Sequence, residues 1–408
     1  MESSSLTNKF SNYKKLIELA ETDWHSAKRG RICELNVTVT HNNYLTDQYE
    51  RNLHHFCTTS YLGLDHHPSI IDGAIQGIRE AKTLRIANSK NRCKLEILER
   101  YELELSAHFN SICLSTLSCS AASSGLLPLL ASGAFTNNCP PTMVFDKQSH
   151  YSMNHIKAAC ADETEVKTAP HNDLSFIEDL CKKRKYVAYI ADGIYSMGGV
   201  ADVEGLLYLK ARYGLFLYMD DSHALSAFGE KGYGFIRPCM RALDDQTLIV
   251  ASLGKSFGAS GGLIMFGTEQ QKSLMYRYGG PSNWSQSLNS AAIGAGLASL
   301  KIHQTEELRT LQEKLQSNIQ LFDKLIHTEQ HGTYTAIRLI TCGEADKANA
   351  LAIQLSDIGF FTSAVFFPVV PRGRAAVRIT LRADMSHTTI KSFCTQLALL
   401  MDKYKINN

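Results

Sequence analysis

The sequence predicts an α/β protein whose core is a mostly parallel sheet of seven strands, covered by helices on both faces. Short apolar runs alternate with helical stretches through the middle of the 408 residues. A long helical region follows, and the chain then returns to a strand–helix–strand pattern. We therefore expect a large domain over residues 61–295. An N-terminal arm of helical and extended segments over 1–60 would precede it, and a smaller α+β domain over 296–408 would follow.

The composition is that of an ordinary globular protein, with 44% apolar residues, 20% charged residues and a net charge of +2. This balance gives no reason to expect nucleic acid as a partner. No apolar run approaches the roughly 20 residues of a membrane helix, and the N-terminus lacks a signal-peptide pattern. The eleven cysteines are scattered and never spaced as zinc ligands, so we expect reduced thiols, a cytoplasmic location and no metal.

The N-terminal part of the chain is expected to combine helices with extended segments. A helix is predicted over about 8–29 and extended segments over 33–40 and 53–64. A turn at Asp65-His66-His67-Pro68 then precedes helices at both ends of 69–109, with a polar loop at 85–92 between them.

Seven apolar runs in the middle of the chain are candidate strands, and helices such as 174–185 and 204–213 separate several of them. The strands are predicted at 115–118, 142–145, 164–168, 187–191, 215–219, 247–251 and 263–266. Beyond Leu288 a helical region shows apolar residues at spacings of three and four. The tail is predicted to contain strands at 335–340, 364–370 and 377–381 and helices at 347–358 and 388–404.

Ligands of such sheets bind beyond the carboxyl ends of the strands, so the residues that follow each strand are the functional candidates. Lys255 follows one strand among small residues and glycines, in Ser252-Leu253-Gly254-Lys255. A lysine with little water around it favours the free amine, which can form a Schiff base with an aldehyde cofactor. The alternative is a surface lysine in a glycine loop.

Acidic residues and histidines follow other strands. Asp220-Asp221-Ser222-His223 places two carboxylates at a buried strand end, where a protonated pyridine nitrogen could meet one of them. A helix cap or salt bridge is the alternative. The imidazole of His150 could cover one face of an aromatic cofactor. Small residues from Ser118 to Gly125 begin an apolar helix, whose amide groups could hold phosphate or could form an ordinary serine-capped start.

Together these motifs resemble pyridoxal-phosphate enzymes of the aspartate-aminotransferase fold (fold type I). More narrowly, they are similar to the α-oxoamine synthases, which include 8-amino-7-oxononanoate synthase, 2-amino-3-ketobutyrate CoA ligase and serine palmitoyltransferase. Tyr61-Leu62-Gly63-Leu64, Asp220-Asp221-Ser222-His223 and Ser252-Leu253-Gly254-Lys255 carry the resemblance, which covers nearly the whole chain.

The resemblance implies a role for each matching residue. Lys255 would carry pyridoxal 5'-phosphate and move the substrate's Cα proton, and Asp220 would pair with the ring nitrogen. His223 and Ser196 would bond the phenolic oxygen of the cofactor, and His150 would stack on its ring. The phosphate would be held by Ser252 and by the backbone of Ser118, Cys119 and Ser120, with a further contact from Ser285 or Ser287 of a neighbouring subunit.

On the substrate side, Arg378 would bind the carboxylate of the amino acid, and Thr59 and Ser60 would lie near it.

The implied reaction is a decarboxylative Claisen-type condensation of an amino acid with an acyl thioester, on coenzyme A or a carrier protein, to an α-amino ketone. The implied assembly is a homodimer with its active site at the subunit interface. The chain departs from the family at Thr59 and Ser60, at Ala224 and Ser226, and at Gly198-Gly199. These changes favour a specialised branch that makes a signalling or secondary-metabolite amino ketone. An aminotransferase, a lyase and a non-catalytic partner subunit are the alternatives.

Overall fold

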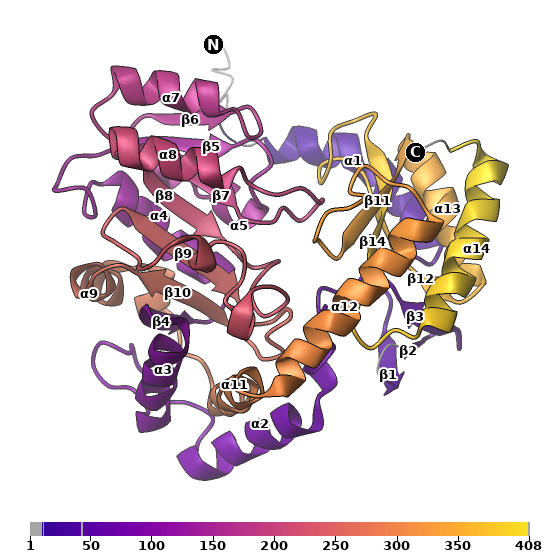
Figure 1. Ribbon diagram of the computed structural model, residues 1–408, viewed down its shortest axis with the longest axis horizontal. Helices are drawn as coiled ribbons and strands as arrows, with labels where there is room; N and C mark the ends of the chain where they lie inside the picture. Colours follow the sequence, from indigo (N-terminus) through magenta and orange to yellow (C-terminus); the bar gives the residue numbers. More distant parts are fainter. Residues whose placement is uncertain (1–9, 11, 42–43, 407–408) are drawn as a thin grey trace, which may run out of the picture. The chain divides into compact units, whose positions relative to one another are not determined.

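A computed structural model describes residue 10 and residues 12–41 and 44–406 (Figure 1). The chain divides into two compact units. The larger unit contains Leu64–Ser196 and Val200–Thr310. The smaller unit contains the chain up to Gly63, the short segment Met197–Gly199, and the chain from Leu311 onward.

The larger unit contains a seven-stranded sheet in the order β4-β10-β9-β8-β7-β5-β6. Its strands are β4 (Ile112–Thr116), β5 (Thr142–Asp146), β6 (Val166–Ala169), β7 (Val187–Asp192), β8 (Phe216–Asp220), β9 (Thr247–Ser252) and β10 (Gly262–Phe266). β10 is antiparallel to both of its neighbours, and the other neighbouring pairs are parallel. All seven predicted strands are present, and the predicted mostly parallel sheet is confirmed.

Both faces of this sheet are buried. Leu217 and Met219 of β8 belong to one apolar cluster, whereas Phe216 and Tyr218 of the same strand belong to another. Successive side chains of a strand point to opposite faces, so each cluster lies under a helical layer. The helices of this unit are α2 (Pro68–Ala81), α3 (Glu96–Phe109), α4 (Cys119–Ala131), α5 (Tyr151–Asn154), α6 (Lys157–Ala161), α7 (Leu174–Lys183), α8 (Val203–Tyr213), α9 (Glu269–Tyr278), α10 (Pro281–Trp284) and α11 (Ser290–His303).

Glycines allow α2 and α11 to pack closely. A Cβ atom at Gly77 would lie 2.2 Å from the carbonyl oxygen of Ser290, and one at Gly294 would lie 2.1 Å from that of Gly73. The predicted long helical region beyond Leu288 is two helices. α11 ends at His303, and α12 (Glu306–Leu325) begins in the larger unit and continues into the smaller one.

The smaller unit contains two sheets, in the orders β1-β2-β3-β12 and β11-β14-β13. Its elements are α1 (Tyr13–Arg29), β1 (Val37–His41), β2 (Tyr44–Asp47), β3 (Asn52–His55), β11 (Ile337–Gly343), α13 (Ala345–Asp357), β12 (Phe360–Phe361), β13 (Ser363–Val365), β14 (Ala375–Thr380) and α14 (His387–Tyr404). β12 pairs in parallel with β3, and His54 is opposite Phe360. The segment expected as a separate arm therefore shares a sheet with the C-terminal region.

Among the helices in the described part of the chain, none has both the length and the apolar content that crossing a membrane requires.

Candidate active site

The carboxyl ends of five parallel strands bring polar side chains to one edge of the large sheet. Asp192 ends β7 directly opposite Asp220, which ends β8, and Ser252 ends the neighbouring β9. Asp146 ends β5, and Cys119 follows β4 at the start of α4. The structure therefore brings together most of the residues that the sequence assigned to a cofactor site.

Lys255 lies beside His223 at this edge. Its Nζ is 2.8 Å from Nε2 of the imidazole. Lys255 is half-buried, so it is less shielded from water than the sequence suggested. The loop that carries it turns at Gly258, which has a φ of +76° and lies so close to Leu64 that a Cβ would be 2.4 Å from the leucine's Cβ. This geometry requires glycine.

Asp220 is a buried carboxylate, with 3% of its surface exposed. Its Oδ1 accepts a hydrogen bond from the backbone N–H of Ser222 at 3.0 Å, and its Oδ2 lies 3.4 Å from Sγ of Cys119. Each carboxylate oxygen has two lone pairs, so Asp220 retains acceptor capacity for a further donor.

Asp221, the second carboxylate of the motif, binds backbone N–H groups of a neighbouring loop. Its Oδ2 accepts the backbone N–H groups of Phe235 and Ile236 at 2.8 and 3.1 Å. Burial raises the pKa of Asp221 to about 7. These bonds fix the loop at 235–236 and indicate a structural role for Asp221, although it is neither the helix cap nor the salt bridge that the sequence offered as the alternative.

The amino end of α4 lies against the start of β10. Ser118 caps the helix by accepting the backbone N–H of Ala121. A Cβ on Gly262 would lie 2.5 Å from the backbone of Ser118 and 2.6 Å from that of Cys119. Glycine there allows the close approach, and Ser120 is left exposed in the first turn. Such a helix start favours anions.

Ser252 lies across from that helix start in the sheet, opposite Gly262 in the strand register. Its Oγ accepts the N–H of Gly254 at 3.2 Å, and its own N–H donates to Oγ of Ser222 at 2.8 Å. Ser252 is therefore held in place between the lysine loop and the Asp220 loop.

His150 starts α5, and its Nδ1 accepts the backbone N–H of Ser152. Its own backbone N–H donates to Oδ2 of Asp192 at 2.9 Å. Burial, followed by the Asp220 charge, raises the pKa of Asp192 well above the usual carboxyl value. Asp192 is not among the predicted site residues, although an acidic residue directly after a predicted central strand indicates such a position.

The loop after His223 contains Ser226, which has a φ of +67°. Oγ of Ser226 lies 2.8 Å from Nε2 of His303, whose Nδ1 is 2.8 Å from the carbonyl oxygen of Ser299. A carbonyl oxygen only accepts, so Nδ1 carries the proton and Nε2 accepts from the serine hydroxyl. Burial lowers the pKa of His303 to about 4. His303 lies far along the chain from Ser226, and no local sequence pattern predicts this contact.

The three other serines predicted to contact the cofactor lie on connecting segments of the larger unit. Ser196 is half-buried on the loop after β7, Ser285 follows α10, and Ser287 precedes α11. α10 packs against α4 within the same chain, because Oγ of Ser282 bonds the carbonyl of Ala121. A contribution of Ser285 or Ser287 from a neighbouring subunit stays a prediction.

The predicted substrate residues lie in the smaller unit. Arg378 is buried on β14, and its side chain hydrogen-bonds Tyr61. Burial nevertheless raises the pKa of the Tyr61 hydroxyl to about 12. Ser60 is buried and Thr59 is half-buried just before this tyrosine. In the sequence Tyr61 is only part of the Tyr61-Leu62-Gly63-Leu64 motif, which does not predict its contact with Arg378.

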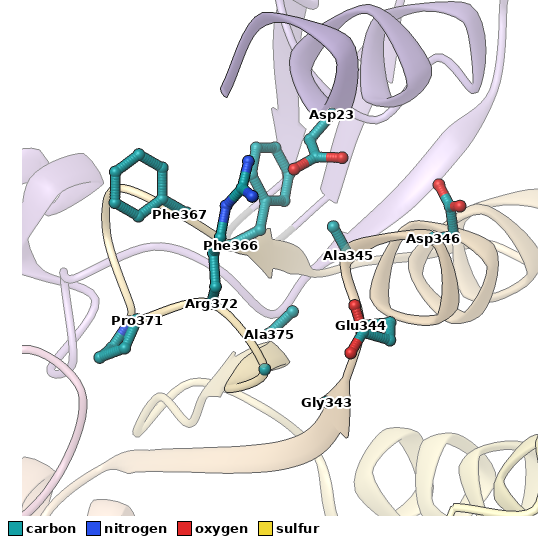
Figure 2. Close-up of a pocket in the computed structure, with 11 residues that line it drawn as sticks. Asp23, Gly343, Glu344, Ala345, Asp346, Phe366, Phe367, Pro371, Arg372 and Ala375 are labelled. Carbon is teal, nitrogen blue, oxygen red and sulfur yellow. The ribbon is translucent and has the colours of Figure 1, made fainter. Parts of the chain in front are cut away.

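A pocket of about 230 Å³ lies elsewhere in the smaller unit (Figure 2). Asp23, Glu344 and Asp346 supply carboxylates to it, and Arg372 supplies a guanidinium group. Burial and the neighbouring Asp346 raise the pKa of Asp23. The described residues that line this pocket differ from those predicted to act in catalysis.

Comparisons with known proteins agree with this geometry. Residues 94–397 match the family model "Aminotransferase class I and II". The chain is 28% identical over 349 residues to the 8-amino-7-oxononanoate synthase of Pseudomonas syringae, covering 82% of this chain and 84% of that protein. It is 27% identical to the serine palmitoyltransferase of Bacteriovorax stolpii, over 80% and 77% of the two chains.

Solved structures show the same fold. A serine palmitoyltransferase from S. paucimobilis superposes with a TM-score of 0.85 at 15% identity, over 97% of this chain and all of that one. An 8-amino-7-oxononanoate synthase from Francisella tularensis superposes with a TM-score of 0.68 at 19% identity, over 86% and 98% of the two chains.

The residues at the sheet edge fit pyridoxal phosphate. A buried carboxylate with spare acceptor capacity suits a protonated ring nitrogen, an amine suits the aldehyde, and a helix start with Ser252 opposite suits phosphate. The expected resemblance to pyridoxal-phosphate-dependent α-oxoamine synthases is confirmed by the relatives. The chain belongs to the aminotransferase class I and II family.

Proposed function

We propose that this protein condenses an amino acid with an acyl thioester, with loss of carbon dioxide, to give an α-amino ketone. The observation that carries the proposal is the 2.8 Å contact of Lys255 Nζ with His223, at the sheet edge where Asp220 lies buried. Relatives with the names 8-amino-7-oxononanoate synthase and serine palmitoyltransferase support it.

The residues at the sheet edge have separate roles in the proposed reaction. Pyridoxal phosphate, when bound, supplies an electron sink for negative charge that develops at the substrate's Cα. Lys255 would take the proton from Cα. His223, whose Nε2 is 2.8 Å from the Lys255 amine, would with Ser196 bond the phenolic oxygen of the cofactor. Asp220 would hold the ring nitrogen, and His150, Ser196, Ser252 and the start of α4 would hold the rest of the cofactor. The assignment of Arg378, Thr59 and Ser60, which lie in the smaller unit, to the amino acid stays a prediction.

The test of the reaction is a matrix of amino acids against acyl thioesters, read by release of the free thiol and by the mass of the product. Stoichiometric thiol release with a decarboxylated product supports a synthase. Keto-acid formation without thiol release would instead identify an aminotransferase. A purified protein that binds no pyridoxal phosphate would favour the non-catalytic subunit.

The test of Lys255 is its replacement by alanine. Lys255→Ala should abolish the visible absorbance of lysine-bound cofactor and the thiol release. The matched control is Lys157→Ala. Burial lowers the pKa of Lys157 to about 8, but this lysine lies on α6 and not in the loop after β9. The control should keep both signals; a Lys255→Ala protein that also keeps them would disprove the assignment.

We further propose a homodimer. Ile71, Ile75 and Ile78 form an apolar stripe on α2, and their exposed fractions are 50%, 43% and 38%. A second copy of the chain would cover this stripe and contribute Ser285 or Ser287 to the site of its partner. Light scattering should report a dimer for the wild type and a monomer for Ile75→Lys. A wild-type monomer would refute the assembly.

A cytoplasmic location is also part of the proposal. All eleven cysteines are free thiols, which suits a reducing compartment.

A further inference from the structure

A hydrogen-bonded network joins three of the strand ends at the proposed site. Sγ of Cys119 lies 3.4 Å from Oδ2 of Asp220 and 3.5 Å from Oγ of Ser222. The same Ser222 hydroxyl oxygen accepts the N–H of Ser252 at 2.8 Å. The network therefore connects the start of α4 with the ends of β8 and β9.

Cys119 is the hydrogen-bond donor toward Asp220. Only 8% of its surface is exposed, and burial, followed by the charge of Asp220, raises the pKa of its thiol well above the usual value. The sulfur therefore keeps its proton, and an ionised carboxylate is an acceptor only.

The backbone holds this cysteine in place. The contact between Gly262 and the Ser118–Cys119 peptide leaves no room for a Cβ, so the start of α4 is fixed against β10. Because Cys119 is the first residue of α4, its side chain leaves the helix at a set position. The contact with Asp220 is therefore a consequence of how the sheet and the helix pack.

Both oxygens of Asp220 receive a donor, Oδ1 from the Ser222 amide and Oδ2 from the thiol. Two donors on two oxygens fix the plane of a carboxylate, and one lone pair on each oxygen stays available. We propose that Cys119 is a positioning residue that, with Ser222, orients Asp220 toward the ring nitrogen of pyridoxal phosphate. This inference rests on the proposed function, since it assigns the same site.

Paired substitutions test the donor. Cys119→Ala removes the thiol donor, and Cys119→Ser replaces it with a hydroxyl donor. A hydrogen bond from a weak donor to a charged group supports an expected increase in the dissociation constant of pyridoxal phosphate of about three- to tenfold for Cys119→Ala. The pH midpoint of the visible absorbance of the bound cofactor should also shift. Cys119→Ser should recover most of both changes.

Cys139→Ala is the matched control, because Cys139 is half-buried just before β5, at the opposite edge of the sheet. It should leave the dissociation constant and the pH midpoint unchanged. A Cys119→Ala protein with the same dissociation constant and pH midpoint as the wild type would overturn the inference. The proposed function would still stand in that case, because the wild-type protein binds the cofactor.

A measurement on the unmodified chain removes any dependence on how the variants fold. Alkylation of each cysteine is followed by mass spectrometry with and without pyridoxal phosphate. The cofactor should slow labelling of Cys119 several-fold and leave Cys139 unaffected. Labelling of Cys119 at the same measurable rate in both states overturns the inference. A wild-type protein that takes up no cofactor overturns the proposed function and this inference with it.

Discussion

The buried contact between His303 and Ser226 predicts that acid weakens the larger unit. His303 is 2% exposed, and its ring is 4.9 Å from that of Phe257 and 5.7 Å from that of His108. Protonation of Nε2 would place a charge among these rings and replace the acceptor of the Ser226 hydroxyl with a donor. The perturbation is His303→Gln, which cannot gain a proton.

The magnitude follows from the pKa values. The pKa of His303 falls from 6.5 to about 4 on folding, so the unfolded chain binds more protons between these values. Its contribution to stability is therefore complete above pH 6.5 and is lost as the pH falls toward 4. Each pKa unit equals about 1.4 kcal/mol, which gives a total of about 3 kcal/mol and a loss of about 2 kcal/mol between pH 7.5 and pH 5.

The assay is urea unfolding of the wild type and of His303→Gln at pH 7.5 and pH 5, followed by circular dichroism. The difference in unfolding free energy between the two proteins should shrink by about 2 kcal/mol at the lower pH. His155→Gln is the control, since His155 is exposed in the same unit, and it should follow the wild type. Free energies of wild type and His303→Gln that fall in parallel would refute the reasoning.

Three further predictions concern buried ionisable residues. Asp220→Asn should keep the cofactor bound but slow exchange of the substrate's Cα hydrogen by about a hundredfold, measured by NMR in deuterated water; unchanged exchange would remove Asp220 from its role. Asp192→Asn should leave the affinity for the cofactor nearly unchanged, because the raised pKa of Asp192 favours the neutral acid. Asp192→Ala should weaken that affinity, because the backbone N–H of His150 loses its hydrogen-bond acceptor. The same change in cofactor affinity for both variants would contradict this reasoning. Arg338→Met should destabilise the smaller unit by about 3–5 kcal/mol in urea unfolding, because Asp323 loses both bonds to Arg338; an additional Asp323→Leu change should restore much of the loss, and no recovery would argue against the pair.

The sequence was most informative where a strand is buried on both faces. The runs at 142–145, 187–191 and 247–251 lie within β5, β7 and β9, which the structure ends at Asp146, Asp192 and Ser252. A continuous apolar run that stops at a polar residue marks both the strand and its carboxyl end. The positions of Asp220, Lys255 and Ser252 at one edge follow from that pattern together with the parallel order.

Contacts between distant segments could not be read in this way. β12 pairs with β3, although the two strands are far apart in the sequence. Nothing in the sequence around Phe360 and Phe361 indicates which strand they pair with. The same holds for Cys119 against Asp220 and for His303 against Ser226. Local periodicity reports which face of an element is buried, whereas the partner on that face depends on the assembled topology.

The reversed direction of β10 has a consequence for the order in which the site forms. β9 and β10 are antiparallel neighbours joined by the Lys255 segment, which is closed by a hydrogen bond from the N–H of Leu253 to the carbonyl of Gly261. The lysine thus belongs to a hairpin with short-range contacts, whereas Asp220 and Asp192 reach it through parallel crossovers. Since long-range pairing generally forms more slowly than local pairing, we expect the lysine turn to form first. The carboxylate side of the site would then limit how soon the folding chain can bind its cofactor.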